Sequence, residues 1–472
     1  MERNLNTKNI QTDLIEHLIT QLENFTIDTS TEPLPLQDFL ILADYFETEF
    51  MFDKALEIID QATVYHGINN EMILRKASLF LQLKDNKAAQ QALDEIEVEG
   101  NEYHEVLLLR AQCLIAEHQY DAAFEMIKLP FRNGTPEERI QSALLKVQIF
   151  EAMKDYNAMF GTIKYILEKD ATNEAAMNKL WDYMESQRSY QQGIFYLNQL
   201  LDKDPYSYLA WFNLGQAYSC TGEYDNALAA YEYAYIINSA FEPAFRECAE
   251  LSYELGKYKI ALNVYLEILD NFGPDAEIFA NIGSCYLQLK QYKQARMQLR
   301  KAMKLDPYND EVLYNLGKCF MAENKYEVAL QYFLRAIRIE DSLEDYMVAA
   351  AMAYHKLGEV NKANYYFIKA TETGPEQPQI WLEQIKFLYQ INEFEKALEV
   401  IEDSENFTYA AELYYARTAL LIAMDKKDEA LKQLGEALID DFYAHRSLFG
   451  FDKSLSKDHD IISLINYYQP EE

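Results

Sequence analysis

The stretch Ala276–Asn309, AEIFANIGSCYLQLKQYKQARMQLRKAMKLDPYN, has the pattern of two short amphipathic helices joined by a tight turn. With Ala276 as position 1, apolar or small residues stand at positions 4, 7, 8 and 11: Phe279, Ile282, Gly283 and Tyr286. This spacing predicts one apolar stripe along a first helix. A second stripe follows at positions 17, 20, 24 and 27: Tyr292, Ala295, Leu299 and Ala302. The second helix is expected to end before Pro307, which has no N–H to donate and disfavours helix in the preceding residue.

The pattern returns along the chain, nearly always after 34 residues. One such pair cannot bury its apolar faces alone, so similar pairs must stack on both sides of it. Gly283 is small enough to let a neighbouring helix approach closely. The unit resembles the tetratricopeptide repeat (TPR) family, whose repeat has this length and an aromatic, Leu-Gly, Tyr, Ala, aromatic, Ala, Pro series. The resemblance, to bacterial-type proteins with many repeats, implies an all-α, right-handed superhelix of about 12 helix-turn-helix units.

Twelve candidate units cover residues 36–440, and the central six fit the pattern best. Their expected starts include Leu36, Asn70, His104, Ile140, Glu174, Tyr208, Glu242, Ala276, Glu344 and Ala411. Before the fourth, Leu129–Glu138 supplies about two extra residues with strong turn chemistry. We therefore predict a capping helix (Thr12–Phe25) and linker over 1–35, divergent repeats over 36–207, well-formed repeats over 208–377, C-terminal repeats over 378–440 and a cap over 441–472.

The net charge of −34 argues against nucleic-acid or anionic-lipid partners, because both are polyanions. The negative charge favours basic or polar partners, or it has no binding role and only keeps the protein soluble. The sequence has no run of eighteen apolar residues, so no transmembrane helix is predicted. The N-terminal residues lack the basic-then-apolar pattern of an export leader. Of the five cysteines, Cys113, Cys285 and Cys319 share position 10, and no CxxC occurs. They are interpreted as small core residues in a reducing compartment, which predicts a cytoplasmic protein.

Basic residues recur at position 26 of consecutive units, on the outer face expected for the second helix: Lys301, Arg335 and Lys369, with Lys304 and Arg338 one turn further on. Members of the family often have lysine there, so a solvated face is favoured over a binding patch.

The sequence contains no HExxH, GxGxxG, GxxxxGK[ST] or GxSxG motif. Glu247 and Glu250 lie one turn apart and are more simply explained as a solvated helix face. We predict no enzyme activity, no catalytic residue, no cofactor and no metal site. The alternative, an enzyme built in the groove, predicts turnover that Glu250→Gln or His355→Ala abolishes.

The resemblance implies a concave groove lined by positions 2, 5, 6, 9, 12 and 13 of the first helices. The candidate groove residues are Phe212, Asn213, Gln216, Arg246, Glu250, Tyr253, Asn281, Tyr314, Asn315, Lys318 and His355, with Glu247, Ser284, Met352, Lys386 and Tyr389 also on this face. Aromatic rings interleaved with amides suit an extended peptide, because amides satisfy its backbone and rings bury its apolar side chains. Asn213, Asn281 and Asn315 share position 6. The resemblance to peptide-binding members implies that this asparagine hydrogen-bonds a ligand main chain, and the alternative is that asparagine is simply common at this position in the family at large.

Chaperone-tail binders of this family hold a terminal carboxylate with a clamp of Lys, Asn and Arg drawn from three consecutive units. The equivalent positions here include Ala280, Ser284, Asp345 and Ala349, so we predict no carboxylate-clamp binding. The leading hypothesis is a non-enzymatic scaffold for a peptide or partner protein in the groove. The alternative is a sensory or regulatory protein whose superhelix changes shape when a peptide or ligand binds, which scattering during a titration would detect.

Overall fold

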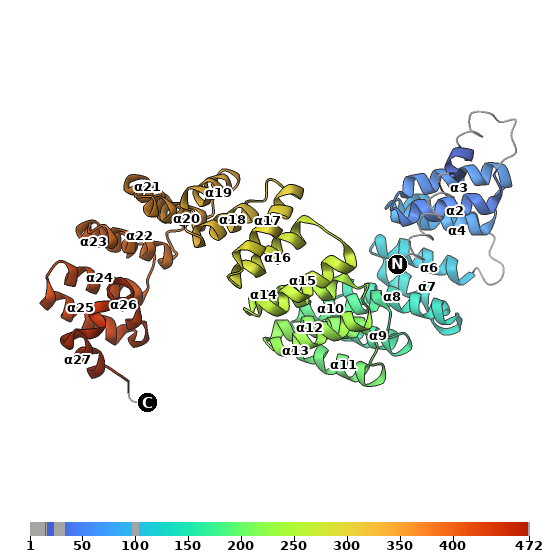
Figure 1. Cartoon of the computed structure of the whole chain (residues 1–472). Helices are drawn as coiled ribbons and strands as arrows, with labels where there is room; N and C mark the ends of the chain where they lie inside the picture. Colours follow the sequence, from blue (N-terminus) through green and yellow to red (C-terminus); the bar gives the residue numbers. More distant parts are fainter. Residues whose placement is uncertain (1–14, 16, 23–33, 97–102, 471–472) are drawn as a thin grey trace. The chain divides into compact units, whose positions relative to one another are not determined.

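The computed structural model describes residues 15, 17–22, 34–96 and 103–470, and every regular element in these ranges is a helix (Figure 1). The all-α expectation is confirmed. Within the described residues, twelve antiparallel helix pairs follow one another, from α2–α3 to α24–α25. The chain forms two compact units, Met1–Ile237 and Asn238–Glu472.

In the first unit each helix pair contacts the next one along the chain. Its labelled helices are α2 (Leu36–Thr48), α3 (Phe52–His66), α4 (Asn70–Gln82), α5 (Asn86–Asp94), α6 (Tyr103–Ala116), α7 (Tyr120–Asn133), α8 (Pro136–Ala152), α9 (Tyr156–Lys169), α10 (Glu174–Gln187), α11 (Tyr190–Lys203), α12 (Tyr208–Thr221) and α13 (Tyr224–Ile237). Residues 15 and 17–22 are also helical, and Ile15, Leu18 and Leu22 are buried in one cluster with Phe39 and Leu42. The remainder of the predicted capping helix lies outside the described residues.

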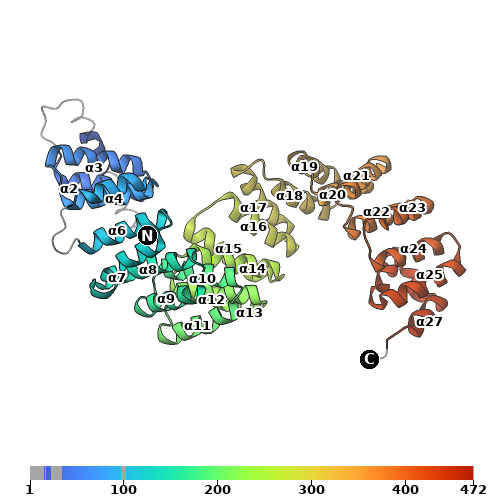
Figure 2. The ribbon, with the colours of Figure 1, turned by 180° about the vertical axis from the view of Figure 1, so that it is seen from behind.

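The second unit repeats the arrangement, and Figure 2 shows its pairs from behind. Its helices are α14 (Glu242–Glu254), α15 (Tyr258–Phe272), α16 (Ala276–Gln288), α17 (Tyr292–Leu305), α18 (Asp310–Ala322), α19 (Tyr326–Ile339), α20 (Glu344–Lys356), α21 (Val360–Thr373), α22 (Pro378–Gln390), α23 (Phe394–Ser404), α24 (Ala411–Ala423), α25 (Lys427–Asp440), η2 (Phe442–Ser447), α26 (Leu448–Phe451), η3 (Lys453–Lys457) and α27 (His459–Tyr467). The division into terminal caps and three groups of repeats stays a prediction.

The core follows the repeat register. Position 24, in the second helix of each pair, is no more than 3% exposed in all twelve pairs: Ile59, Leu93, Ile127, Ile163, Leu197, Tyr231, Tyr265, Leu299, Phe333, Phe367, Ile401 and Leu434. Where position 8 of the first helix is glycine, the position-24 side chain lies directly against it: Tyr231 against Gly215, Leu299 against Gly283 and Phe333 against Gly317. A Cβ built on Gly283 would lie 2.6 Å from Leu299 Cγ, and one on Gly317 would lie 2.4 Å from Phe333 Cε1. The close approach predicted at Gly283 is confirmed, and the neighbour is its own second helix.

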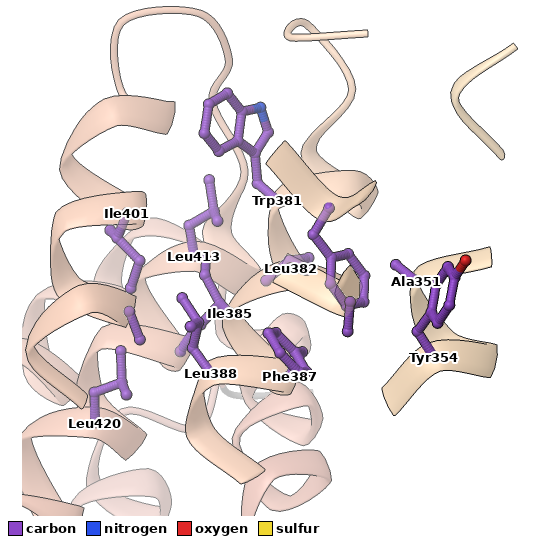
Figure 3. Packing of buried hydrophobic residues seen from close by; sticks show 14 residues of the cluster. Ala351, Tyr354, Trp381, Leu382, Ile385, Phe387, Leu388, Ile401, Leu413 and Leu420 are labelled. Carbon is purple, nitrogen blue, oxygen red and sulfur yellow. The ribbon is translucent and has the colours of Figure 1, made fainter. Parts of the chain in front are cut away.

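Within each unit, a helix pair also buries side chains against the pair that follows. Figure 3 shows one such cluster, in which Tyr354 of α20, Trp381 and Phe387 of α22 and Leu413 and Leu420 of α24 lie in the same apolar interior. Continuous burial from pair to pair is the reason that a single pair is not an independent domain.

The turn inside each pair requires one residue in the left-handed region, with φ between 49° and 80°. These residues are Phe50, Lys84, His118, Lys154, Arg188, Gly222, Gly256, Lys290, Asn324, Gly358, Asn392 and Asp425. At Lys290 the backbone N–H donates to Leu287 O at 2.9 Å, and Gln291 N–H donates to Tyr286 O at 2.8 Å. This is a Schellman motif, which closes the C-terminus of the first helix.

We expect Lys290→Gly to stabilise the protein by roughly 0.5–1 kcal/mol. Glycine removes the steric strain of a Cβ on a left-handed backbone, and this gain exceeds the cost of the extra conformational entropy that glycine has in the unfolded chain. Urea denaturation monitored by circular dichroism measures the change. Asn324→Gly is the matched control and should gain less, because asparagine tolerates this conformation. Gly222→Ala should lose about 1 kcal/mol, since nothing lies near its missing Cβ and only its φ of 80° matters. Equal midpoints for all three would contradict the explanation.

The predicted start at Ile140 is wrong by four residues. Helix α8 begins at Pro136 because Thr135 and Glu138 form a capping box, with Glu138 N donating to Thr135 Oγ1 at 3.2 Å and Thr135 N donating to Glu138 Oε2 at 2.6 Å. The predicted turn over Leu129–Glu138 is correspondingly short. Helix α7 continues through Pro130, whose ring is buried, to Asn133, although proline cannot donate the helical hydrogen bond.

Candidate peptide-binding cleft

First helices of the second unit line a cleft of about 480 Å³. Its lining residues come from α14, α18, α20 and the turns before them: Tyr253, Asn309, Asp310, Glu311, Tyr314, Asn315, Lys318, Leu343, Glu344, Asp345 and Tyr346. Four of the predicted groove residues, Tyr253, Tyr314, Asn315 and Lys318, therefore meet at one place. The volume is within the range of clefts that hold small ligands or peptide side chains.

Tyrosines form a fixed wall of the cleft. The ring centroid of Tyr314 lies 4.6 Å from that of Tyr346 and 5.8 Å from that of Phe333. The Tyr346 hydroxyl donates to Asp310 Oδ2 at 2.8 Å, which ties α20 to the start of α18. Burial, and then the nearby Asp345 carboxylate, raise the pKa of Tyr314 to about 12. Across the cleft, Tyr253 Oη accepts a hydrogen bond from Gln288 Nε2 at 3.3 Å.

Asn315 lies at the base of the cleft and is only 6% exposed. Its Nδ2 donates to Ser284 Oγ at 3.1 Å and to Glu311 Oε1 at 3.4 Å. In the first unit, Asn213 Nδ2 donates to Met177 O at 2.9 Å. Both amide nitrogens are thus used within the protein. Among the described residues no hydrogen bond reaches the Asn315 carbonyl oxygen, so this side chain offers a ligand an acceptor and not a donor.

The charge of the cleft is predominantly negative. Four carboxylates line it, those of Asp310, Glu311, Glu344 and Asp345, and Lys318 is the one basic residue among the lining residues. The Lys318 ammonium lies over the Tyr314 ring, 4.8 Å from its centroid. Sequence reasoning missed all four acids as site residues, because acidic residues in the first turn of a helix are also explained by the helix dipole.

A second acidic cluster surrounds Arg246 on α14. Arg246 donates to Glu242 Oε1 at 2.7 Å, to Glu277 Oε2 at 3.1 Å and to Asp275 Oδ2 at 3.4 Å. On the same helix, burial and neighbouring acids raise the pKa values of Glu247 and Glu250. Arg246 is therefore already held inside the protein.

The remaining predicted groove residues are dispersed. Phe212 and Gln216 lie on α12 in the first unit, and Asn281 lies half-buried on α16. On α20, His355 Nε2 is 2.9 Å from Gln390 Oε1, and the His355 ring packs edge-on against Phe387. None of these four residues lines the cleft.

The cysteines and the row of basic residues lie outside the cleft. Cys113, Cys285 and Cys319 are buried as expected for core residues, and no disulfide joins the five thiols. The basic side chains at position 26 lie over aromatic rings, Lys301 at 4.8 Å from the Phe279 centroid and Lys369 at 5.3 Å from that of Tyr365. Among described residues, no cluster of three or more His, Cys, Asp or Glu is arranged to hold a metal ion. In the same ranges, the helices are too short or too polar to cross a membrane.

The position-specific pattern of these helix pairs matches two family models described as tetratricopeptide repeat, one over residues 286–353 and the other over 179–243 and 249–310. The chain is a multi-repeat TPR protein. TPR proteins bind protein partners, and their repeats build interaction scaffolds.

Curated relatives of this TPR protein match it over short segments. Protein CTR9 homolog of Arabidopsis thaliana is 28% identical over 128 residues, 27% of this chain and 12% of that protein. Tetratricopeptide repeat protein 37 of Xenopus laevis is 22% identical over 245 residues, 49% of this chain and 15% of that protein. The chain thus spans less than a fifth of the length of these relatives.

Solved structures with a similar fold include YrrB, described as a TPR protein with an unusual peptide-binding site, at 21% identity and a TM-score of 0.33, covering 39% of this chain and 95% of YrrB. The APC/C hetero-tetramer Cut9-Hcn1 has 15% identity and a TM-score of 0.38, covering 92% of this chain and 94% of that one.

The raised pKa of Tyr314 predicts a loss of stability at alkaline pH. An unfolded tyrosine releases its proton near pH 10, whereas folded Tyr314 keeps it until pH is about 12. The folded state therefore binds more protons in this window, and the free energy of unfolding falls as pH rises through it. Urea midpoints at about pH 9 and pH 11 should show a smaller decline for Tyr314→Phe than for the wild type. An identical decline in both proteins would contradict this prediction.

Proposed function

We propose that this TPR protein is a non-enzymatic scaffold that binds an extended segment of a partner protein in the cleft lined by α14, α18 and α20. The observation that supports it most is the convergence of Tyr253, Tyr314, Asn315 and Lys318 in one cleft. The packed tyrosine wall gives a ligand apolar contact area without the entropic cost of ordering flexible side chains. The Asn315 carbonyl oxygen offers an acceptor for a main-chain or side-chain N–H.

Affinity capture from native lysate, with quantitative mass spectrometry, tests the cleft. We expect Tyr314→Ala/Asn315→Ala to lose one or more partners that the wild type retains. Because both side chains are largely buried, Lys318→Glu is a second variant, which reverses one charge in the cleft at a half-buried side chain. Tyr308→Ala, at a side chain that is 79% exposed outside the cleft, is the control. An unchanged set of captured proteins for both cleft variants would refute the assignment.

We also propose that the cleft does not hold the acidic C-terminal tails of chaperones. The positions that would supply a carboxylate clamp carry Ala280, Ser284, Asp345 and Ala349. Ser284 is itself buried and accepts the hydrogen bond from Asn315. A peptide ending in acidic residues should show no saturable change in fluorescence anisotropy. Tight, salt-sensitive binding of that peptide would contradict this expectation.

The predictions of no enzyme activity and of a cytoplasmic location remain open to direct test. Turnover that disappears in Glu250→Gln or His355→Ala would identify an enzyme. Cell fractionation would test the location.

A further inference from the structure

Two acidic residues of the cleft occupy the same repeat positions as two of the three acids that hold Arg246. Glu242 is position 1 of its unit and Glu277 is position 2 of the next, and both accept hydrogen bonds from the Arg246 guanidinium. Two units further on, Asp310 and Asp345 occupy these two positions. Arg246 stands at position 5, where the later unit has Tyr314. The second site therefore has two of the three carboxylates that hold Arg246, with Leu343 at the position of Asp275, and it has no arginine of its own.

The groups around Asp310 and Asp345 leave this negative charge largely uncompensated. Within the described ranges, the Asp310 carboxylate accepts one side-chain hydrogen bond, from the neutral Tyr346 hydroxyl. Asp345 is exposed, and its charge acts on the Tyr314 hydroxyl. Lys318 makes no ion pair in the described part of the chain, because its ammonium lies on the Tyr314 ring. An incoming cation would thus meet free carboxylate oxygens at the rim of the cleft.

The other polar groups of the cleft favour a ligand that donates hydrogen bonds. The Asn315 carbonyl oxygen is an acceptor at the base of the cleft, and the residue is only 6% exposed. Glu311 and Glu344 add two more carboxylates. A guanidinium suits this set better than an ammonium does, because its planar fork of five N–H groups pairs with two carboxylates at once and stacks on aromatic rings.

We propose that the occupant of the cleft is an extended protein segment carrying an arginine, whose guanidinium is held by Asp310 and Asp345 as Arg246 is held by Glu242 and Glu277. This inference depends on the proposed function, since it specifies the ligand of the same cleft. The Asn315 carbonyl oxygen receives a further N–H from the segment.

The test uses the full chain and a fluorescein-labelled, extended peptide of about twelve residues with one central arginine flanked by apolar residues. A second peptide replaces arginine by citrulline, which has nearly the same shape and no charge. In fluorescence anisotropy we expect the arginine peptide to bind at least about tenfold more tightly than the citrulline peptide, because charge-assisted hydrogen bonds contribute most of the difference. A lysine peptide should bind with intermediate affinity.

Asp310→Asn/Asp345→Asn should weaken binding of the arginine peptide about tenfold and weaken binding of the citrulline peptide much less, because citrulline keeps N–H donors and has no charge. The matched control is Glu327→Gln/Glu372→Gln, which removes the same charge from exposed positions on α19 and α21. Equal weakening by both pairs would show that attraction to the net charge of −34 explains the binding, and would overturn the proposal. Because both aspartates lie at helix starts, circular dichroism confirms that the variant is folded.

The two proposals fail in different ways. If arginine and citrulline peptides bind equally, and Lys318→Glu alters both, the cleft binds peptides and only the arginine preference is wrong. If neither peptide binds, and capture from lysate is unchanged by both Tyr314→Ala/Asn315→Ala and Lys318→Glu, the proposed function fails as well.

Discussion

Deletion of residues 441–472 is expected to unfold the last helix pair, α24–α25, while the earlier pairs stay folded. The segment contributes four buried aliphatic side chains to the cluster around Tyr415 and Leu434: Leu448, Leu455, Ile461 and Ile465. Burial of each contributes roughly 1.5–3 kcal/mol, so the loss is on the order of 5 kcal/mol or more. The buried Tyr415 hydroxyl also donates to Asp441 O at 2.7 Å, a partner that the deletion removes. Repeat proteins unfold pair by pair, because each pair contacts only its neighbours.

Hydrogen exchange measured by mass spectrometry checks this result. Amides of α24 and α25 should lose protection, and those of α14–α17 should keep it. Ile461→Ala, which removes one buried side chain, should lower stability by about 2–4 kcal/mol. Tyr467→Ala is the control, since that side chain is 79% exposed, and it should change little. Full protection of α24–α25 in the truncated chain would show that residues 441–472 are not a cap.

The second large effect is expected for Phe333→Ala, at position 24 of its unit. The Phe333 side chain is 1% exposed and lies against Gly317, with the Tyr314 ring 5.8 Å away. Its truncation leaves a cavity that the helices cannot close, at a cost of about 3–5 kcal/mol. Because Phe333 supports the tyrosine wall of the cleft, partner binding should weaken in the same variant.

Urea denaturation, with hydrogen exchange to locate the loss, measures the effect of Phe333→Ala. Phe333→Leu should lose much less, because the chain already has Leu299 at this position of the preceding unit. Phe195→Ala is the matched surface control, since its ring is 66% exposed. If Phe195→Ala were as destabilising as Phe333→Ala, burial at position 24 could not be the cause.

The repeat register was predictable from the sequence because burial follows a fixed period. Position 24 carries a large apolar residue in each unit, and the structure buries all of them. The start of α8 was not predicted, because the capping box at Thr135 and Glu138 shifts a helix start without altering the apolar pattern.

The cleft was predicted only in part. Tyr314, Asn315 and Lys318 lie on one helix face, so their proximity follows from spacing alone. The contribution of Tyr253 depends on how α14, α16 and α18 stack, which the sequence does not specify. The hydrogen bond between Asn315 and Ser284 joins residues 31 apart in the chain, and it changes which end of the amide faces a ligand.

The left-handed turns have a practical consequence for engineering. Nine of the twelve carry a residue other than glycine, and each belongs to a different helix pair. Substitutions at separate sites without shared partners combine nearly additively. Glycine at all nine positions would therefore raise the summed free energy of unfolding of the repeats by on the order of 5 kcal/mol. None of the nine residues lines the cleft. This stabilised variant would stay folded when destabilising substitutions are introduced in the cleft.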